Sequence, residues 1–115
     1  DLIIATELNR DLNYFSDIAG SWVRDVHSYF IQVNTSEFGD SRIMRPTSKD
    51  NRDMVVVKGG KNPIAIIDDI DIHALRDFQI KEYNLQMQAK DSFKLTPPNF
   101  DVSKVKKRAD DKEMW

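Results

Sequence analysis

Hydrophobic residues recur at alternating steps of four and three residues over the first third of the chain. The series consists of Leu8, Leu12, Phe15, Ala19, Trp22, Val26, Tyr29 and Val33. This spacing places side chains on one face of a helix, so the pattern predicts a single long amphipathic helix. A helix over residues 6–34 would be about 42 Å long, more than a domain of this size can cover, which points to a neighbouring chain.

The ends and flanks of this helix are also readable. Thr6 is the expected N-cap and Asn34 the expected end, while Gly20 is the position at which such a helix would bend. Ile18, Val23 and Phe30 flank the stripe and make it broader than the seam of a coiled coil. We therefore expect the helix to pack against several elements.

Two runs of mainly β-branched residues, 54–57 and 64–67, predict strands. The intervening residues include Gly59, Gly60 and Pro63, so the runs are expected to form an antiparallel β-hairpin. Residues 41–45 are expected to be either a short strand, which would give a three-stranded meander, or a loop facing a partner.

A second helix is predicted over residues 71–90, capped by Asp68, Asp69 or Asp71. Proline at positions 97 and 98 ends regular structure and begins a highly charged tail, for which we expect an extended C-terminal arm. The predicted fold is α+β, with a single small domain over residues 1–92 and the arm over residues 93–115.

Composition limits the classes of function. The 115 residues include 17 basic and 19 acidic ones, and a net charge of -2 gives no overall attraction to nucleic acid. Absence of cysteine excludes disulfides and thiolate zinc sites, and no apolar run is long enough to span a membrane. We expect a soluble protein or one held by other subunits. Because the first residue is Asp1 rather than Met, we also expect that an upstream segment was removed; the compartment is not readable.

The run from Asp68 to His73 is the best place in the sequence to look for a metal, since it holds three carboxylates and an imidazole. Helix capping explains the same residues more simply, and we favour it. With two histidines and no cysteine, a histidine-based catalytic site lacks parts. We therefore expect no catalytic residues, no metal and no cofactor, and predict that the chain is not an enzyme.

Our first hypothesis is a structural subunit that docks into a larger protein assembly through its long helix and its arm. Aromatic and large apolar residues dominate interface energetics and are the expected contacts. These are Trp22, Val26, Tyr29, Phe30, Val33, Phe93, Phe100 and Trp115. Two alternatives remain: the stripe is the core of this domain, and the arm is a solvated tail.

Basic residues are in excess between positions 42 and 61, and Arg42, Arg45, Lys58 and Lys61 are among them. Such a cluster is compatible with ordinary solvated charge, with a protein contact, or with an anion or nucleic acid. No aromatic residue interleaves the cluster, so base stacking has no support. Nucleic acid therefore ranks below protein as a partner.

Two segments also carry a family resemblance. Residues 4–8, Ile-Ala-Thr-Glu-Leu, lead into Leu12, Phe15 and Ile18, and residues 55–67 read as strand, basic glycine turn and strand before a capped helix. Together they resemble antitoxins of the Phd/YefM type. The resemblance implies a short strand before the first helix, a dimeric operator-binding module with Arg10, Lys58 and Lys61 near DNA, and a C-terminal arm that wraps a toxin.

Overall fold

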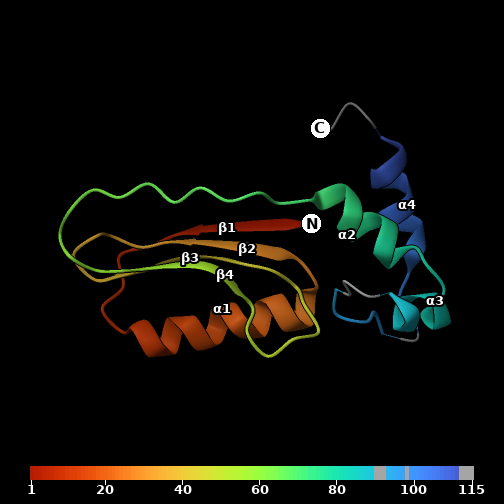
Figure 1. Ribbon diagram of the computed structural model, residues 1–115, viewed down its shortest axis with the longest axis horizontal. Coiled ribbons are helices and arrows are strands. Elements are labelled where there is room, and N and C mark those ends of the chain that lie inside the picture. The colour runs from red at the N-terminus through yellow and green to blue at the C-terminus, as the bar shows by residue number, and fades with distance from the viewer. Residues whose placement is uncertain (90–92, 98, 112–115) are drawn as a thin grey trace.

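A four-stranded sheet with a helix on one face forms the larger part of the structure. The computed structural model describes residues 1–89, 93–97 and 99–111. Across these residues the strand order is β1-β2-β3-β4, with bounds Leu2–Thr6, Tyr29–Val33, Gly39–Met44 and Asp53–Lys58. Helix α1 (Leu12–Val26) connects β1 with β2, which are parallel, and the other strand pairs are antiparallel. The predicted mixed α+β class is confirmed (Figure 1).

The prediction of a single helix over residues 6–34 is wrong in its length, because α1 spans only Leu12–Val26. Asp11, rather than Thr6, is the N-cap, and its side chain accepts a hydrogen bond from the backbone nitrogen of Tyr14 at 3.0 Å. At the other end His27 has a φ of 55° and ends the helix well before Asn34. The helix therefore has 15 residues.

The flanks of the predicted stripe belong to other elements. Leu8 precedes the helix, and Tyr29 and Val33 lie in β2. A step of four residues is two periods of a strand as well as about one turn of a helix, so these positions fit either pattern. Aromatic and β-branched residues between positions 29 and 33 favour the strand.

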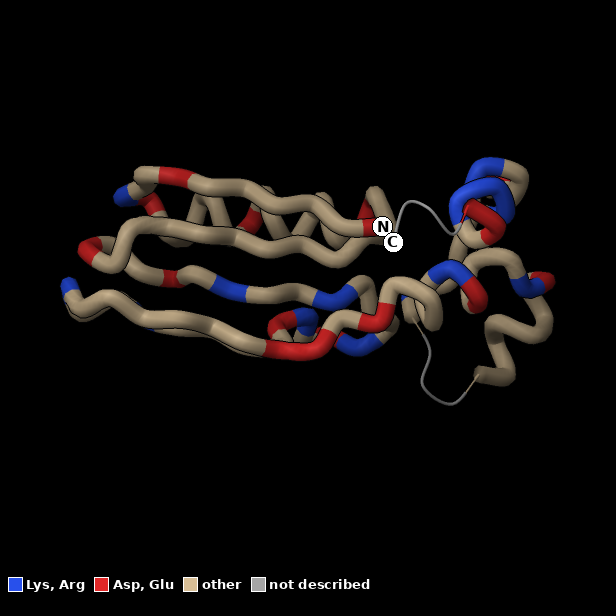
Figure 2. Tube along the Cα trace, turned by 90° about the horizontal axis from the view of Figure 1, so that it is seen from above, with Lys and Arg blue, Asp and Glu red and all other residues tan. Residues whose placement is uncertain are grey.

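The predicted hairpin is wrong in its second strand. Residues 54–57 lie in β4 as expected, but residues 64–67 form no strand, and β4 instead pairs with β3, with Ser41 opposite Val57. Of the two alternatives expected for residues 41–45, a short strand or a loop facing a partner, the structure shows the strand. After β4 the chain runs in extended form along the side of the sheet opposite α1 (Figures 1 and 2). Pro63 lacks the N–H group that a ladder needs, which disfavours strand pairing at the start of this run.

The second predicted helix is divided into α2 (Ile72–Gln79) and α3 (Tyr83–Gln88). Asp71 caps α2 as predicted, with its side chain accepting a hydrogen bond from Ala74 at 2.9 Å. Between the two helices, the side-chain amide of Gln86 donates to the backbone oxygen of Lys81 at 3.0 Å. This side chain satisfies a carbonyl that a continuous helix would have used.

The predicted extended arm contains a helix, α4 (Val102–Asp110). Val105 is buried, and Arg76 of α2 donates a hydrogen bond to the backbone oxygen of Arg108 at 3.2 Å. Asp101 caps the helix by accepting from Ser103 at 3.0 Å. The helix depends on the burial of Val105 against α2, a tertiary contact that could not be predicted from the highly charged sequence of this segment.

Two hydrophobic clusters lie on the two faces of the sheet. The cluster beneath α1 contains Ala19, Val23, Phe30 and Met44. The cluster beneath α2 contains Tyr29, Leu75, Phe78 and Phe93. Phe93 packs edge-on against two rings of the second cluster, with centroid distances of 6.1 Å to Tyr29 and 5.7 Å to Phe78. One face of the sheet is thus covered by α1, while the extended segment after β4 runs along the other face and α2 lies beyond the end of β1 (Figure 1).

Candidate protein interface

An apolar groove opens between α1 and the edge strand β1. Its volume is about 210 Å³. The lining residues are all hydrophobic: Ile3 and Ala5 of β1, Phe30 of β2, and Phe15, Ile18 and Trp22 of α1. No acid, base or nucleophile is among these six side chains, so the groove is suited to holding apolar groups and not to chemical conversion.

The groove exists because α1 buries only part of its apolar surface. Ala19 and Val23 face the sheet and are fully buried. A second row at four-residue spacing lies beside them and includes Trp22 and Val26, which remain 49% and 50% exposed. These two residues were predicted from the sequence as contacts, and the structure places them on the same flank of one helix.

The outer edge of β1 is open along the described part of the chain, because the sheet order begins with this strand. Asp1 accepts a hydrogen bond from Tyr29 at 2.9 Å, and Glu7 donates one to Val33 at 2.8 Å. Since backbone groups of a strand point to alternate sides, odd-numbered residues bond β2. The even-numbered residues Leu2, Ile4 and Thr6 therefore direct their N–H and C=O groups outward.

This edge lacks three common obstacles to strand addition. Natural edge strands are blunted by lysine, proline or a bulge, whereas β1 reads Leu-Ile-Ile-Ala-Thr. Ile4 is 62% exposed and lies on the face opposite α1, since its neighbours Ile3 and Ala5 line the groove. An incoming strand would meet both hydrogen-bonding groups and apolar side chains.

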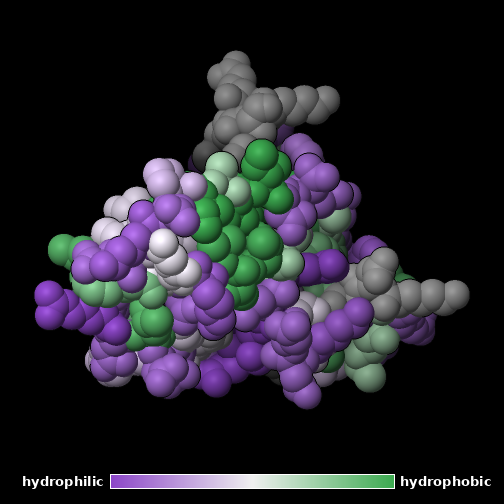
Figure 3. All heavy atoms as spheres, turned by 60° about the vertical axis from the view of Figure 1, so that its left-hand side comes forward, coloured by the Kyte–Doolittle hydropathy of each residue, from purple (hydrophilic) through white to green (hydrophobic). Residues whose placement is uncertain are grey.

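Exposed hydrophobic residues are also found on the side opposite α1. Val33 at the end of β2 and Ile64 and Ile67 of the extended segment are exposed. Figure 3 shows hydrophobic side chains gathered on one face and surrounded by hydrophilic residues.

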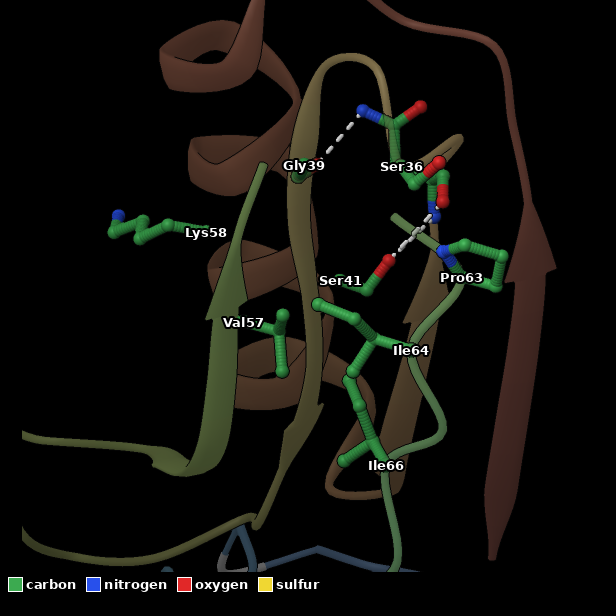
Figure 4. A pocket seen from close by; sticks show the side chains of 9 residues that line it. Ser36, Gly39, Ser41, Val57, Lys58, Pro63, Ile64 and Ile66 are labelled. Carbon is green, nitrogen blue, oxygen red and sulfur yellow. Dashed lines mark hydrogen bonds between the residues drawn. The ribbon is translucent and has the colours of Figure 1, made fainter. Parts of the chain in front are cut away.

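A second hollow, of about 210 Å³, lies under the extended segment between β3, β4 and the β2–β3 turn. Figure 4 shows Ile64 and Ile66 pointing across it toward Ser41 and Val57. Its polar groups bond within the chain: the side-chain amide of Asn34 donates to Gly39 at 2.9 Å, and its backbone N–H donates to Ser41 at 2.9 Å. These bonds hold the turn together.

Several other predicted contact residues lie elsewhere. Tyr29 and Phe93 are buried in the core of this chain, and Phe30, although it is among the residues that line the groove, is only 4% exposed. The ring of Phe100 is partly buried, with its centroid 6.4 Å from that of His27. Trp115 lies outside the described residues.

Arg42 in β3 and Arg45 directly after this strand do not form an exposed cationic patch. Arg42 is 8% exposed and forms ion pairs of 3.3 Å with both Asp40 and Asp53. The guanidinium of Arg45 stacks 4.4 Å from the ring centroid of Phe93. Burial and internal pairing give both side chains a structural role.

The remaining basic residues surround the β2–β3 turn. The guanidinium of Arg10 lies 5.6 Å from the ring centroid of Phe38, Lys58 forms an ion pair of 2.9 Å with Asp40, and the backbone of Lys61 bonds Ser36 at 3.2 Å. Figure 2 shows basic and acidic positions together at this end of the sheet. Acidic neighbours therefore offset the positive charge.

His27, at the C-terminal end of α1, is a buried titratable residue. His27 is 7% exposed, and burial, together with the positive charge of Lys94, lowers its pKa from the ordinary 6.5. A hydrogen bond with the backbone of Lys94 and the negative charge of Asp25 raise the pKa, but more weakly. The neutral imidazole is thus the favoured form in the folded state.

Over residues 1–89, 93–97 and 99–111, no group of three or more His, Cys, Asp or Glu side chains is arranged to hold a metal ion. Asp71, the closest residue of the acidic run to a helix, serves as the α2 cap. Among the described helices, none has the length and hydrophobicity to cross a bilayer.

Comparison with known proteins gives no family assignment. No family model matches the chain, and no curated protein or solved structure matches it.

Sequence reasoning missed four of the six residues that line the groove as contacts: Ile3, Ala5, Phe15 and Ile18. A signal for the strand was present, since residues 2–6 are uncharged and contain two consecutive isoleucines. The edge position of that strand depends on the order of the sheet, which no local pattern reveals.

Proposed function

We propose that this chain is a non-enzymatic interaction subunit that binds another protein chain along β1 and α1. The observation that carries the proposal is the coincidence of an open, uncharged strand edge with a wholly apolar groove. Strand addition supplies backbone hydrogen bonds, and the groove supplies pockets for side chains, which is a common mode of protein recognition. The C-terminal arm is not the main contact in this proposal, because Phe93 and Val105 are buried against the chain itself.

Trp22 is the residue expected to contribute most to binding. It lines the groove while remaining half exposed, and tryptophan is enriched among residues that dominate interface energies. Burying its remaining surface would add apolar contact without disturbing the core beneath Ala19 and Val23.

Site-specific photo-cross-linking in the cells that naturally make the protein tests the proposal. A photoreactive phenylalanine analogue would replace Trp22, and in a matched strain it would replace Asp17, an exposed residue on the opposite, polar flank of the same helix. We expect a discrete protein adduct at position 22 that is absent at position 17 and is lost on adding Ile4→Lys. Equal labelling at both positions, or no adduct at position 22, would overturn the proposal.

Duplex DNA binding is a second candidate, favoured by one observation. Arg10, Lys58 and Lys61, which the antitoxin resemblance implies as DNA contacts, all surround the β2–β3 turn. Asp40 pairs with Lys58 and reduces the positive charge there, so this candidate ranks second. Binding to a duplex at low salt that weakens steeply as salt rises would support it.

A further inference from the structure

We propose that the partner at the β1 edge is a second copy of this chain, bound by antiparallel pairing of the two β1 strands about a two-fold axis at Ile4. This inference rests on the proposed function and specifies its partner. It is drawn from the backbone register, the apolar row of α1 and the charges at the two ends of β1.

The free backbone groups of β1 are self-complementary in this register. Ile4 would lie opposite Ile4 of the second copy, and Leu2 opposite Thr6. These are the residues whose N–H and C=O groups face outward, so the two strands would exchange about six hydrogen bonds. Ile3 and Ala5 would face each other at the closer, non-bonded positions, on the side that lines the groove.

The exposed apolar residues account for the rest of the interface. A stable interface buries on the order of 800 Å² on each partner, which a five-residue strand does not provide alone. The two-fold axis brings the outer flanks of both α1 helices to the same side of the joined sheet. This flank carries Tyr14, Trp22 and Val26, which are all exposed.

Charges at the ends of β1 are complementary in the same register. Glu7 of one copy would lie opposite Asp1 of the other. The carboxylate of Asp1 is bound by two arginines, Arg76 at 2.7 Å and Arg108 at 3.1 Å, and the side chain of Arg108 is 34% exposed where Glu7 of the other copy would approach. The carboxylate of Glu7 accepts a hydrogen bond from a neutral partner, the side-chain amide of Gln32, at 2.8 Å. Because of the two-fold symmetry, this contact between Glu7 of one copy and the Asp1 end of the other occurs twice in the dimer.

Disulfide trapping tests the register directly, because the chain has no cysteine. Residues directly opposite each other in a bonded antiparallel pair have α-carbons about 5.5 Å apart, within the range that a disulfide spans. Ile4→Cys is therefore expected to form a covalent dimer under mild oxidation. Ile67→Cys is the matched control, since Ile67 is 89% exposed and lies away from β1.

Mass measurement in solution tests the dimer without a new bond. The full chain is expected at twice 13.4 kDa, the mass of one chain. Ile4→Lys should weaken dimerisation by at least about 100-fold, because two isoleucines leave the interface and two lysines face each other. Ile67→Lys should leave the dimer intact, and far-ultraviolet circular dichroism would verify that both variants fold.

The outcomes separate this inference from the proposed function. A monomeric wild-type chain, or equal cross-linking of Ile4→Cys and Ile67→Cys, would overturn the dimer. If the adduct formed at position 22 in cells then contained a different protein, the proposed function would stand with another partner. If that position gave no adduct either, both proposals would fail.

Discussion

The guanidinium of Arg42 donates a hydrogen bond to the hydroxyl of Ser16 at 2.9 Å, joining β3 to α1 beneath the helix. The same arginine pairs with Asp40 and Asp53 and is almost fully buried. A position that looks like surface charge in the sequence therefore connects two layers of the fold. It also fixes the orientation of α1, and with it the width of the groove on the other flank of the helix.

Replacing this arginine should destabilise the protein strongly. Arg42→Ala leaves Asp40 and Asp53 without their shared cation, and breaking a buried ion pair on one side costs about 3 kcal/mol. Urea denaturation would measure the change in the free energy of unfolding. Arg24→Ala is the matched control: Arg24 pairs with Asp25 at the surface, so its loss should leave the midpoint unchanged. Equal effects for the two variants would contradict the structural role of Arg42.

Two glycines should respond oppositely to alanine. Gly39 has a φ of 80°, and a Cβ there would overlap the backbone of Gly59, so Gly39→Ala should cost at least about 2 kcal/mol. Gly20 lies within α1, where a Cβ would meet only the methyl group of Met44 at 3.9 Å. Gly20→Ala should therefore stabilise the protein by about 0.5–1 kcal/mol. Thermal unfolding of both variants measures these changes, and a destabilising Gly20→Ala would mean that α1 is strained at this point.

His27 should make stability depend on pH. Because burial lowers its pKa from 6.5, the unfolded chain binds the proton more readily than the folded one. Its contribution is complete above pH 6.5 and is lost as the pH falls through the lowered folded value. His27→Asn, which tolerates the positive φ of 55°, should flatten the decline in unfolding free energy below pH 6.5 relative to the wild type. Parallel pH profiles for the two proteins would show that another group is responsible.

Adjacent residues of α1 should separate binding from stability. Val23 is 1% exposed, and Val23→Ala should reduce the free energy of unfolding by about 2 kcal/mol. Trp22→Ala should change the stability of the dilute chain little but weaken association through the groove. Unfolding at low protein concentration and mass at high concentration would measure the two effects. If Trp22→Ala reduced the free energy of unfolding as much as Val23→Ala, Trp22 would belong to the core and not to a binding surface.

Sequence periodicity identified the elements more reliably than their ends. Tyr29 and Val33 fit a helix as well as a strand, since a four-residue step satisfies both periods. The cap at Asp71 was predictable because it is a local interaction between a side chain and the next turn of backbone. Elements that depend on distant contacts were not predictable, such as α4, where Arg76 of α2 donates a hydrogen bond to the backbone oxygen of Arg108.

The candidate interface was predicted only in part for the same reason. Trp22 and Val26 could be found because they continue an apolar row along one helix. Ile4 could not, since its importance depends on β1 lying at the edge of the sheet. Tyr29 and Phe93 were predicted to contact a partner because they are aromatic. They instead pack against each other inside the chain, with ring centroids 6.1 Å apart.

Amide hydrogen exchange along β1, followed by nuclear magnetic resonance at high protein concentration, tests the central claim most directly. Ile3 and Ala5 bond β2 and should be protected in any folded state, whereas Ile4 and Thr6 are protected only if a strand is added at the open edge. We predict slow exchange at all four positions in the wild type, with protection at Thr6 lost in Ile4→Lys. Rapid exchange at Ile4 and Thr6 beside protected Ile3 and Ala5 would show that the edge is bare and contradict the account.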